Sequence, residues 1–180
     1  MLNGPGGLLS PLESRPFSKS RSLVAFESGP PDARKMHSFE SDLDFDSRPV
    51  LQGLYESEYA RMGVIVGTNV VLFQQTAQPI PKTELEAIWH GIDASLASVV
   101  RSAHALLLDV RKARGRNDPE FEQLFAPHRT RLVLGWRRVA IVVMTAPGLL
   151  QVQRYAREDN LDVRIFEDPN AAFAWLRRAY

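Results

Sequence analysis

The sequence predicts one α/β domain whose sheet begins with an antiparallel hairpin and continues with alternating strands and helices. The segments 105–110 and 139–144 are unbroken apolar runs, which is typical of strands buried on both faces. The segments between and after them carry apolar residues at helical spacing. A helix between one strand and the next requires a right-handed crossover, so we expect a mixed sheet that is mostly parallel after the hairpin.

Residues 1–52 differ in composition from the rest of the chain. They are rich in Ser, Pro and Gly, and their few apolar residues show no sustained period. Such a segment buries too little surface to offset the entropy of ordering it, so we predict a disordered tail over 1–52 and a domain over 53–180. The acidic and aromatic segment 39–46 leaves two alternatives open, an inert tail or a short docking motif.

The domain is expected to open with β-structure at 54–61, 64–66 and 70–76, with turns at Gly63 and 67–69. A helix should follow, because Thr83 and Glu86 have the spacing of a capping box. The helix is expected to end near Ser102. Its predicted inner stripe consists of Leu85, Ile88, Trp89, Ile92, Leu96, Val99 and Val100.

Three further helices follow the buried strands. Asp118 and Pro119 predict a cap and first turn, Pro127 should kink or split that helix, and Gly135 should end it. The expected inner face of this helix holds Phe121, Leu124, Phe125, His128 and Leu132. The next helix should run from Thr145 to about Asn160, with Leu149, Val152, Gln153 and Ala156 inward. A strand at 163–166 and a helix after Asp168 complete the domain, the latter burying Ala172, Phe173 and Leu176.

Composition excludes several classes of function. The chain has no cysteine, which removes disulfides, thiolate zinc sites and thiol nucleophiles. The histidines are scattered, so we expect no metal site and no cofactor. The net charge is +1 and no apolar run approaches the roughly 20 residues of a membrane helix, so we expect a cytoplasmic protein without membrane insertion.

The loop at 111–118 is the candidate binding site, because it joins the end of a buried strand to a helix N-terminus. The candidate partner- or anion-binding residues are Arg111, Lys112, Arg114, Arg116, Asn117, Asp118 and Thr145. Guanidinium groups and backbone amides at such a place could bind an anion, but no Gly-Lys-Ser/Thr follows, as a phosphate loop requires. A solvated loop, a protein-docking patch and a phosphate or nucleotide site remain open.

No catalytic residues are predicted. Asp109 could act as a general base, but at the end of a buried strand it more often accepts hydrogen bonds from loop amides and holds the turn. The sequence contains no Gly-Xaa-Ser-Xaa-Gly motif. Nucleic acid is not an expected partner, since no recognition helix or aromatic platform is evident. We therefore expect a non-enzymatic protein.

Several segments resemble the STAS family (sulfate transporter and anti-sigma-factor antagonist), in its stand-alone bacterial form. The segments that carry the resemblance are 106–111, 115–121, 138–146, 150–159 and 163–176. The resemblance implies a STAS-like fold and a role as a protein-interaction module in regulation. In the family's antagonists a serine at a helix N-terminus is phosphorylated, whereas residues 116–119 here contain no serine or threonine. Asp118 lies at or beside the position of that serine. There it either mimics the phosphorylated residue as a permanent negative charge or only caps the helix.

The predicted function is thus a non-enzymatic STAS-like interaction module that binds a regulatory protein in bacterial signalling. The alternative is a domain that binds a small ligand, namely an anion, a nucleotide or a lipid. A further expectation is self-association to a homo-oligomer through the edge of the hairpin at 54–76, because exposed strand edges pair readily.

Overall fold

The computed structural model describes residues 45, 49–116 and 118–178. The tail predicted over 1–52 lies mostly outside the described residues, and its disorder stays a prediction. The strands are β1 (Leu51–Glu56), β2 (Ala60–Ile65), β3 (Val70–Gln75), β4 (Ala105–Asp109), β5 (Val139–Val142) and β6 (Arg164–Phe166). The helices are α1 (Leu85–Leu96), α2 (Pro119–Val133), α3 (Ala146–Glu158) and α4 (Pro169–Arg177), with 3₁₀ turns η1 (Lys82–Glu84) and η2 (Arg101–Ala103).

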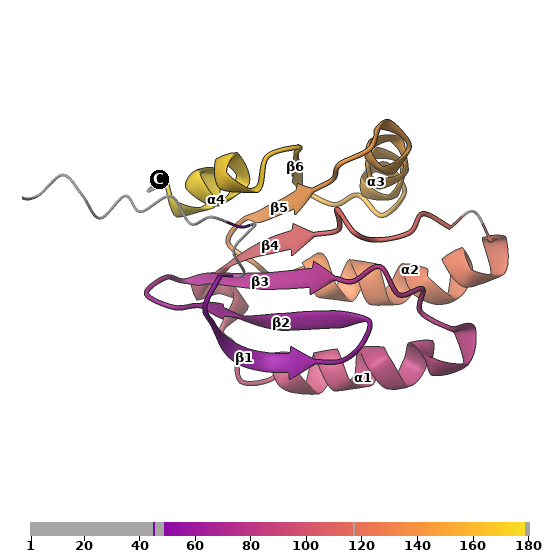
Figure 1. The fold of residues 1–180 in the computed structure, drawn as a ribbon, viewed down its shortest axis with the longest axis horizontal. Helices are drawn as coiled ribbons and strands as arrows, with labels where there is room; N and C mark the ends of the chain where they lie inside the picture. Colours follow the sequence, from indigo (N-terminus) through magenta and orange to yellow (C-terminus); the bar gives the residue numbers. More distant parts are fainter. Residues whose placement is uncertain (1–44, 46–48, 117, 179–180) are drawn as a thin grey trace, which may run out of the picture. The chain divides into compact units, whose positions relative to one another are not determined.

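The six strands form one sheet in which spatial order follows chain order, from β1 to β6 (Figure 1). The pairs β1–β2 and β2–β3 are antiparallel, and the pairs β3–β4, β4–β5 and β5–β6 are parallel. The two apolar runs lie side by side in the same direction, with Leu107 opposite Ala140. The predicted fold class, an antiparallel hairpin followed by alternating strands and helices, is confirmed.

The turn between the first two strands lies elsewhere than expected. The sequence analysis places a turn at Gly63, but Gly63 is in the middle of β2, and the chain turns at residues 57–59. Ser57 fixes that turn, because its hydroxyl accepts hydrogen bonds from the backbone N–H groups of Tyr59 and Ala60. Gly63 is needed for close approach instead: a Cβ there would lie 2.6 Å from the carbonyl oxygen of Gln52, beside a bulge in β1.

The sheet is covered on both faces. One face packs against α1, α2 and partly buried residues of α3, and the other face packs against α4. Phe45, which falls within the expected tail, is buried on the α4 face and meets Phe173 edge to face, with 5.5 Å between the ring centroids. β1 also begins inside that range, at Leu51. The α4 face is therefore completed by a residue that precedes the first strand.

The start of α1 differs from the expected capping box. Glu84 occupies the N-cap without a side-chain hydrogen bond, after the 3₁₀ turn η1. Glu86 instead contacts His128 of α2, with 3.2 Å between its Oε1 and His Nε2. His128 is buried as expected, although its ring stacks on Trp89 of α1 rather than on the sheet.

The other helices follow the expected pattern more closely. Asp118, Thr145 and Asp168 cap α2, α3 and α4 with their side chains. Pro127 does not split α2, which runs through it as one helix. Trp136 is half-buried and donates a hydrogen bond to the carbonyl of Leu132.

Candidate functional site

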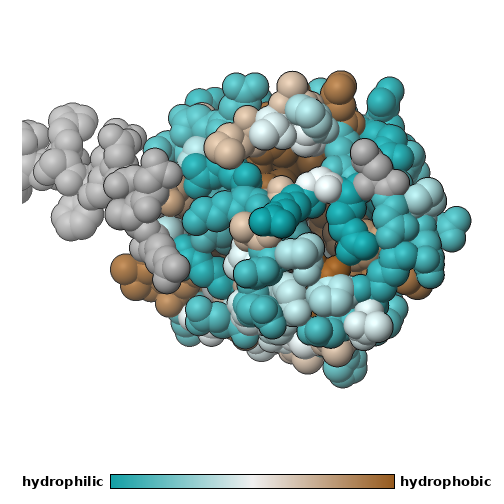
Figure 2. Space-filling model, turned by 45° about the vertical axis from the view of Figure 1, so that its right-hand side comes forward, coloured by the Kyte–Doolittle hydropathy of each residue, from teal (hydrophilic) through white to brown (hydrophobic). Residues whose placement is uncertain are grey.

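A large apolar cavity lies on the α1, α2 and α3 side of the sheet. Its volume is about 890 Å³. Figure 2 shows hydrophobic surface at the bottom of a hollow whose rim is hydrophilic. Its apolar lining includes Phe73, Trp89, Leu108, Phe121, Phe125, Leu132, Ile141, Val143, Val152, Leu161 and Val163. The cavity is open to solvent on one side, so these apolar side chains are accessible to a small molecule.

The cavity exists because α3 does not pack closely on the sheet. No residue of α3 is buried, whereas α1 buries Leu85, Ile88, Trp89, Ile92 and Leu96. The expected inner face of α3 is only partly right: Leu149, Val152 and Ala156 are half-buried, but Gln153 is exposed. The apolar side chains of β4 and β5 that α3 would otherwise cover line the cavity instead.

The aromatic wall of the cavity comes from α1, α2 and β3. Trp89 stacks with Phe73 at 6.1 Å between ring centroids and lies 5.5 Å from Phe125, which in turn stacks with Phe121. Such pairs stabilise one another beyond the area that they bury. This wall is therefore built independently of α3, and the cavity does not depend on α3 for its shape on that side.

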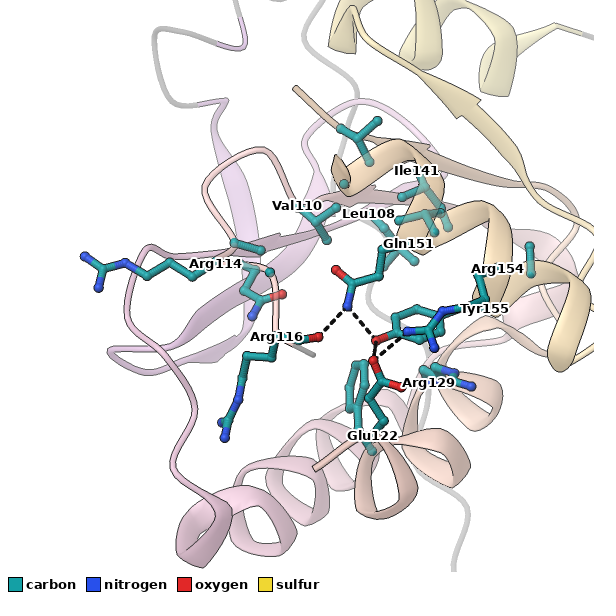
Figure 3. Close-up of a pocket in the computed structure, with 18 of the residues that line it drawn as sticks. Leu108, Val110, Arg114, Arg116, Glu122, Arg129, Ile141, Gln151, Arg154 and Tyr155 are labelled. Carbon is teal, nitrogen blue, oxygen red and sulfur yellow. Dashed lines mark hydrogen bonds and ion pairs between the residues drawn. The ribbon is translucent and has the colours of Figure 1, made fainter. Parts of the chain in front are cut away.

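Polar contacts tie α3 to α2 and to the loop at the mouth of the cavity (Figure 3). Gln151 donates hydrogen bonds to the carbonyl of Arg116 and to the hydroxyl of Tyr155, each at 2.7 Å. The Tyr155 hydroxyl donates to Glu122 at 3.1 Å, and Arg154 pairs with the same carboxylate. We call Glu122, Gln151, Arg154 and Tyr155 the polar clasp.

The clasp keeps its carboxylate charged. The hydrogen bond from Arg154 lowers the pKa of Glu122, against the opposing effect of burial, and Tyr155 adds to the lowering. Burial raises the pKa of Tyr155, and the charge on Glu122 raises it further. At neutral pH the clasp is thus an ionised carboxylate held by a guanidinium and a protonated phenol.

Asp109 and Arg111 hold each other at the end of β4. The carboxylate of Asp109 accepts from the backbone N–H of Arg111 at 3.2 Å and from its Nε and guanidinium at 3.0 Å. Gln74 donates to the same carboxylate at 2.8 Å, and Gln74 accepts from Arg61. Burial raises the pKa of Asp109, but the hydrogen bonds from Arg111 and Gln74 lower it further than burial raises it. The geometry supports the expected role of holding the turn.

Arg116 and Asp118 also face each other. The guanidinium of Arg116 lies 3.2 Å from the carboxylate of Asp118, donates to the carbonyl of Ile80 and stacks on Phe121 at 3.9 Å. Asp118 accepts from the backbone N–H of Phe121 and pairs with Lys82 at 2.9 Å. The hydrogen bond from Lys82 lowers the pKa of Asp118. Asp118 is thus a helix cap that is already neutralised by neighbouring cations.

The remaining candidate residues are distributed around the opening. Lys112 and Arg114 are exposed, and Thr145 is exposed at the N-cap of α3, where its hydroxyl accepts from Gly148. Arg114 and Thr145 line the cavity, and so do Arg111 and Arg116. Asn117 lies outside the described residues. The structure thus places the predicted loop at the mouth of a cavity whose existence the sequence does not indicate.

None of the side chains of the clasp is among the site residues that the sequence predicts. The sequence signal that could have identified them is a stripe of α3 on which the polar residues Gln151 and Tyr155 lie beside the apolar Val152.

The described residues contain neither a metal-binding cluster nor a membrane-spanning helix. Within residues 45, 49–116 and 118–178, no group of three or more His, Asp or Glu residues could hold a metal ion. No helix in the same part of the chain has both the length and the apolarity to cross a bilayer.

Comparison with known proteins yields a likeness of fold. No protein-family profile and no curated protein matches the chain. A solved structure from Shewanella loihica, an uncharacterised protein of the DUF3478 family described as having a SpoIIAA-like fold, is similar with a TM-score of 0.49. The two sequences are 15% identical, and the match covers 65% of this chain and 91% of that chain. The likeness says nothing of activity or ligand.

Proposed function

We propose that this domain binds a small, mainly apolar molecule in the cavity between the sheet and α3. The observation that carries the proposal is a cavity of about 890 Å³ that is lined mainly by apolar side chains and has polar and charged side chains among its lining. Ligand pockets in proteins have volumes of roughly 300–1,000 Å³ and the same division between apolar walls and a few polar groups. The proposed ligand corresponds to one of the alternatives that the sequence leaves open, a domain that binds a lipid.

Binding would be driven by removing apolar surface from water. The walls offer aromatic rings on one side and aliphatic side chains such as Leu108, Ile141 and Val152 on the other. Each Å² of apolar surface removed from water contributes about 25 cal/mol. The clasp at the mouth would remain in contact with solvent, so the body of the ligand need not be polar.

Ligand binding can be tested with a cavity-filling variant and a matched control on the same helix. Val152 lines the cavity, and its neighbour Gln153 is exposed and does not. We expect straight-chain alcohols to raise the melting temperature of the full chain, since a ligand that binds only the folded state at 100 times its Kd adds about 2.7 kcal/mol of stability. Val152→Trp should weaken alcohol binding at least tenfold in titration calorimetry, and Gln153→Trp should leave it unchanged.

A panel of apolar ligands that never shifts the melting temperature would contradict the proposal. Protein docking would then be the better explanation of this face. Met144 and Leu150 are 70% and 66% exposed at the rim of the cavity, beside the loop that carries Arg114. Exposed apolar side chains next to charged ones are typical of partner surfaces. This second candidate retains the regulatory interaction module that the STAS resemblance implies.

A further inference from the structure

The charged side chains that line the cavity are mostly neutralised by other residues. Arg111 is paired with Asp109, and Arg116 is paired with Asp118. Arg129 is paired with Asp159, and Arg154 with Glu122. A ligand group that used one of these arginines would have to displace a carboxylate. The paired arginines are therefore not available to bind an anionic ligand.

Arg114 is different. It lines the cavity and is exposed, and among the described residues it has no hydrogen bond, ion pair or ring contact. Figure 3 shows its side chain extending from the loop away from the other labelled residues. Lys112, close by in the loop, is likewise exposed and without such a contact in the part of the chain that the structure describes. Turning Arg114 toward the opening breaks no contact with the described residues, so its main cost is side-chain entropy.

We propose that the molecule bound in the cavity is an amphiphile with a single negative charge, such as a fatty acid. Its chain lies against the apolar walls, and its carboxylate lies at the rim, where Arg114 pairs with it. This inference rests on the proposed function and specifies the ligand that the domain takes.

Other charged classes fit the lining less well. A nucleoside di- or triphosphate carries several charges and needs several free cations, but the lining arginines other than Arg114 already hold carboxylates. A cationic amphiphile needs a free carboxylate, but Glu122, the acidic side chain among the described residues that line the cavity, is held by Arg154 and Tyr155. Among the described residues that line the cavity, Arg114 is the cation without a carboxylate partner, and Lys112 does not line the cavity, so the lining offers one unpaired positive charge to a ligand.

The test compares three ligands with the same chain: dodecanoate, dodecanol and dodecylamine. Each is titrated into the full chain below its critical micelle concentration, and the Kd is measured by calorimetry at low and high salt. Dodecanoate should bind more tightly than the other two. An exposed ion pair changes affinity by up to about fivefold, so Arg114→Gln should weaken dodecanoate binding about threefold, and Arg114→Glu, which repels the carboxylate, about tenfold. The difference in the Kd of dodecanoate between the wild type and the Arg114 variants should become smaller at high salt.

The control is Arg157→Glu, which makes the same charge change on an exposed arginine of α3 that does not line the cavity. It should leave every Kd unchanged. Equal binding of dodecanoate and dodecanol, with no effect of Arg114→Glu, would overturn this inference while the proposed function stands. Tightest binding of dodecylamine would overturn it as well. Binding of none of the three would count against the proposed function itself.

Discussion

At the scale of single residues, Asp109 shows how a charge is kept inside this fold. Its side chain is 3% exposed and that of Arg111 is 18% exposed, so both partners are largely removed from water. Breaking such a pair leaves one charge without its partner, which is more costly than losing a surface ion pair. The network through Gln74 to Arg61 also connects β2, β3 and β4 at their ends.

We expect Asp109→Asn to lower the free energy of unfolding by about 3 kcal/mol at pH 7. The folded protein has a lowered pKa for Asp109, so this stability is present above the unfolded value of about 4 and is lost as the pH falls through the folded pKa. The difference in the free energy of unfolding between wild type and variant should therefore become smaller below about pH 4. Urea denaturation of both proteins at pH 7 and at pH 3 measures this difference.

Asp162→Asn is the control, because Asp162 is exposed and its removal should change stability little. A gap for Asp109→Asn that stays the same at both pH values would show that the charge of Asp109 is not what stabilises the loop.

At the scale of elements, α3 is held differently from α1 and α4. Those two helices bury several apolar side chains, whereas α3 has none buried and is attached through the polar clasp and half-buried contacts. Elements with few buried contacts open at a lower free energy than the core does. The helix over the cavity should thus be the least stable of the three.

Hydrogen exchange of peptides from 146–158 should accordingly be faster than exchange of peptides from 85–96. Tyr155→Phe keeps the ring on which Arg129 stacks and removes only the hydroxyl that bonds Glu122 and Gln151. Each of these two hydrogen bonds contributes about 1 kcal/mol, so exchange in α3 should become at least about fivefold faster in this variant. Exchange in α3 as slow as in α1 would show that the half-buried contacts hold the helix without the clasp.

At the scale of the whole molecule, the boundary of the stable domain is the property most open to test. Phe45 is 4% exposed and packs on Phe173, although it lies in the range predicted as tail. Removing residues 1–40 should leave the melting temperature unchanged. Removing residues 1–50 should lower it by roughly 10 °C, because truncating a buried Phe costs about 3 kcal/mol.

Phe45→Ala in the full chain should reproduce most of that loss, and Val50→Ala should not, since Val50 is 72% exposed. An unchanged melting temperature after removal of residues 1–50 would support the original boundary.

The sequence predicts the sheet better than it predicts the site, for a physical reason. A strand buried on both faces needs continuous apolar residues, so Leu106–Leu108 and Ala140–Val142 are visible as strands without further information. Gly63 was misassigned because a glycine marks either a turn or a close approach, and local sequence does not distinguish the two.

The cavity could not be predicted in the same way. Helical periodicity tells which side of α3 faces inward, but not how far the helix lies from the sheet. That distance depends on contacts between distant residues, such as the hydrogen bond from Gln151 to the carbonyl of Arg116. The loop at 111–118 was correctly placed at a helix N-terminus, yet the partners of its charged side chains include Lys82 and Ile80, far away in the sequence.

The agreement between strand order and chain order bears on how the protein is made. Each strand from β2 to β6 pairs with the strand synthesised just before it, so every new strand leaving the ribosome finds its neighbour already present. The face of the sheet that α4 covers has no such advantage. Its cover, α4, comes after β6 in the chain, so Phe45 and the apolar side chains around it stay exposed until α4 has emerged from the ribosome. During synthesis this is the surface on which a chaperone would act.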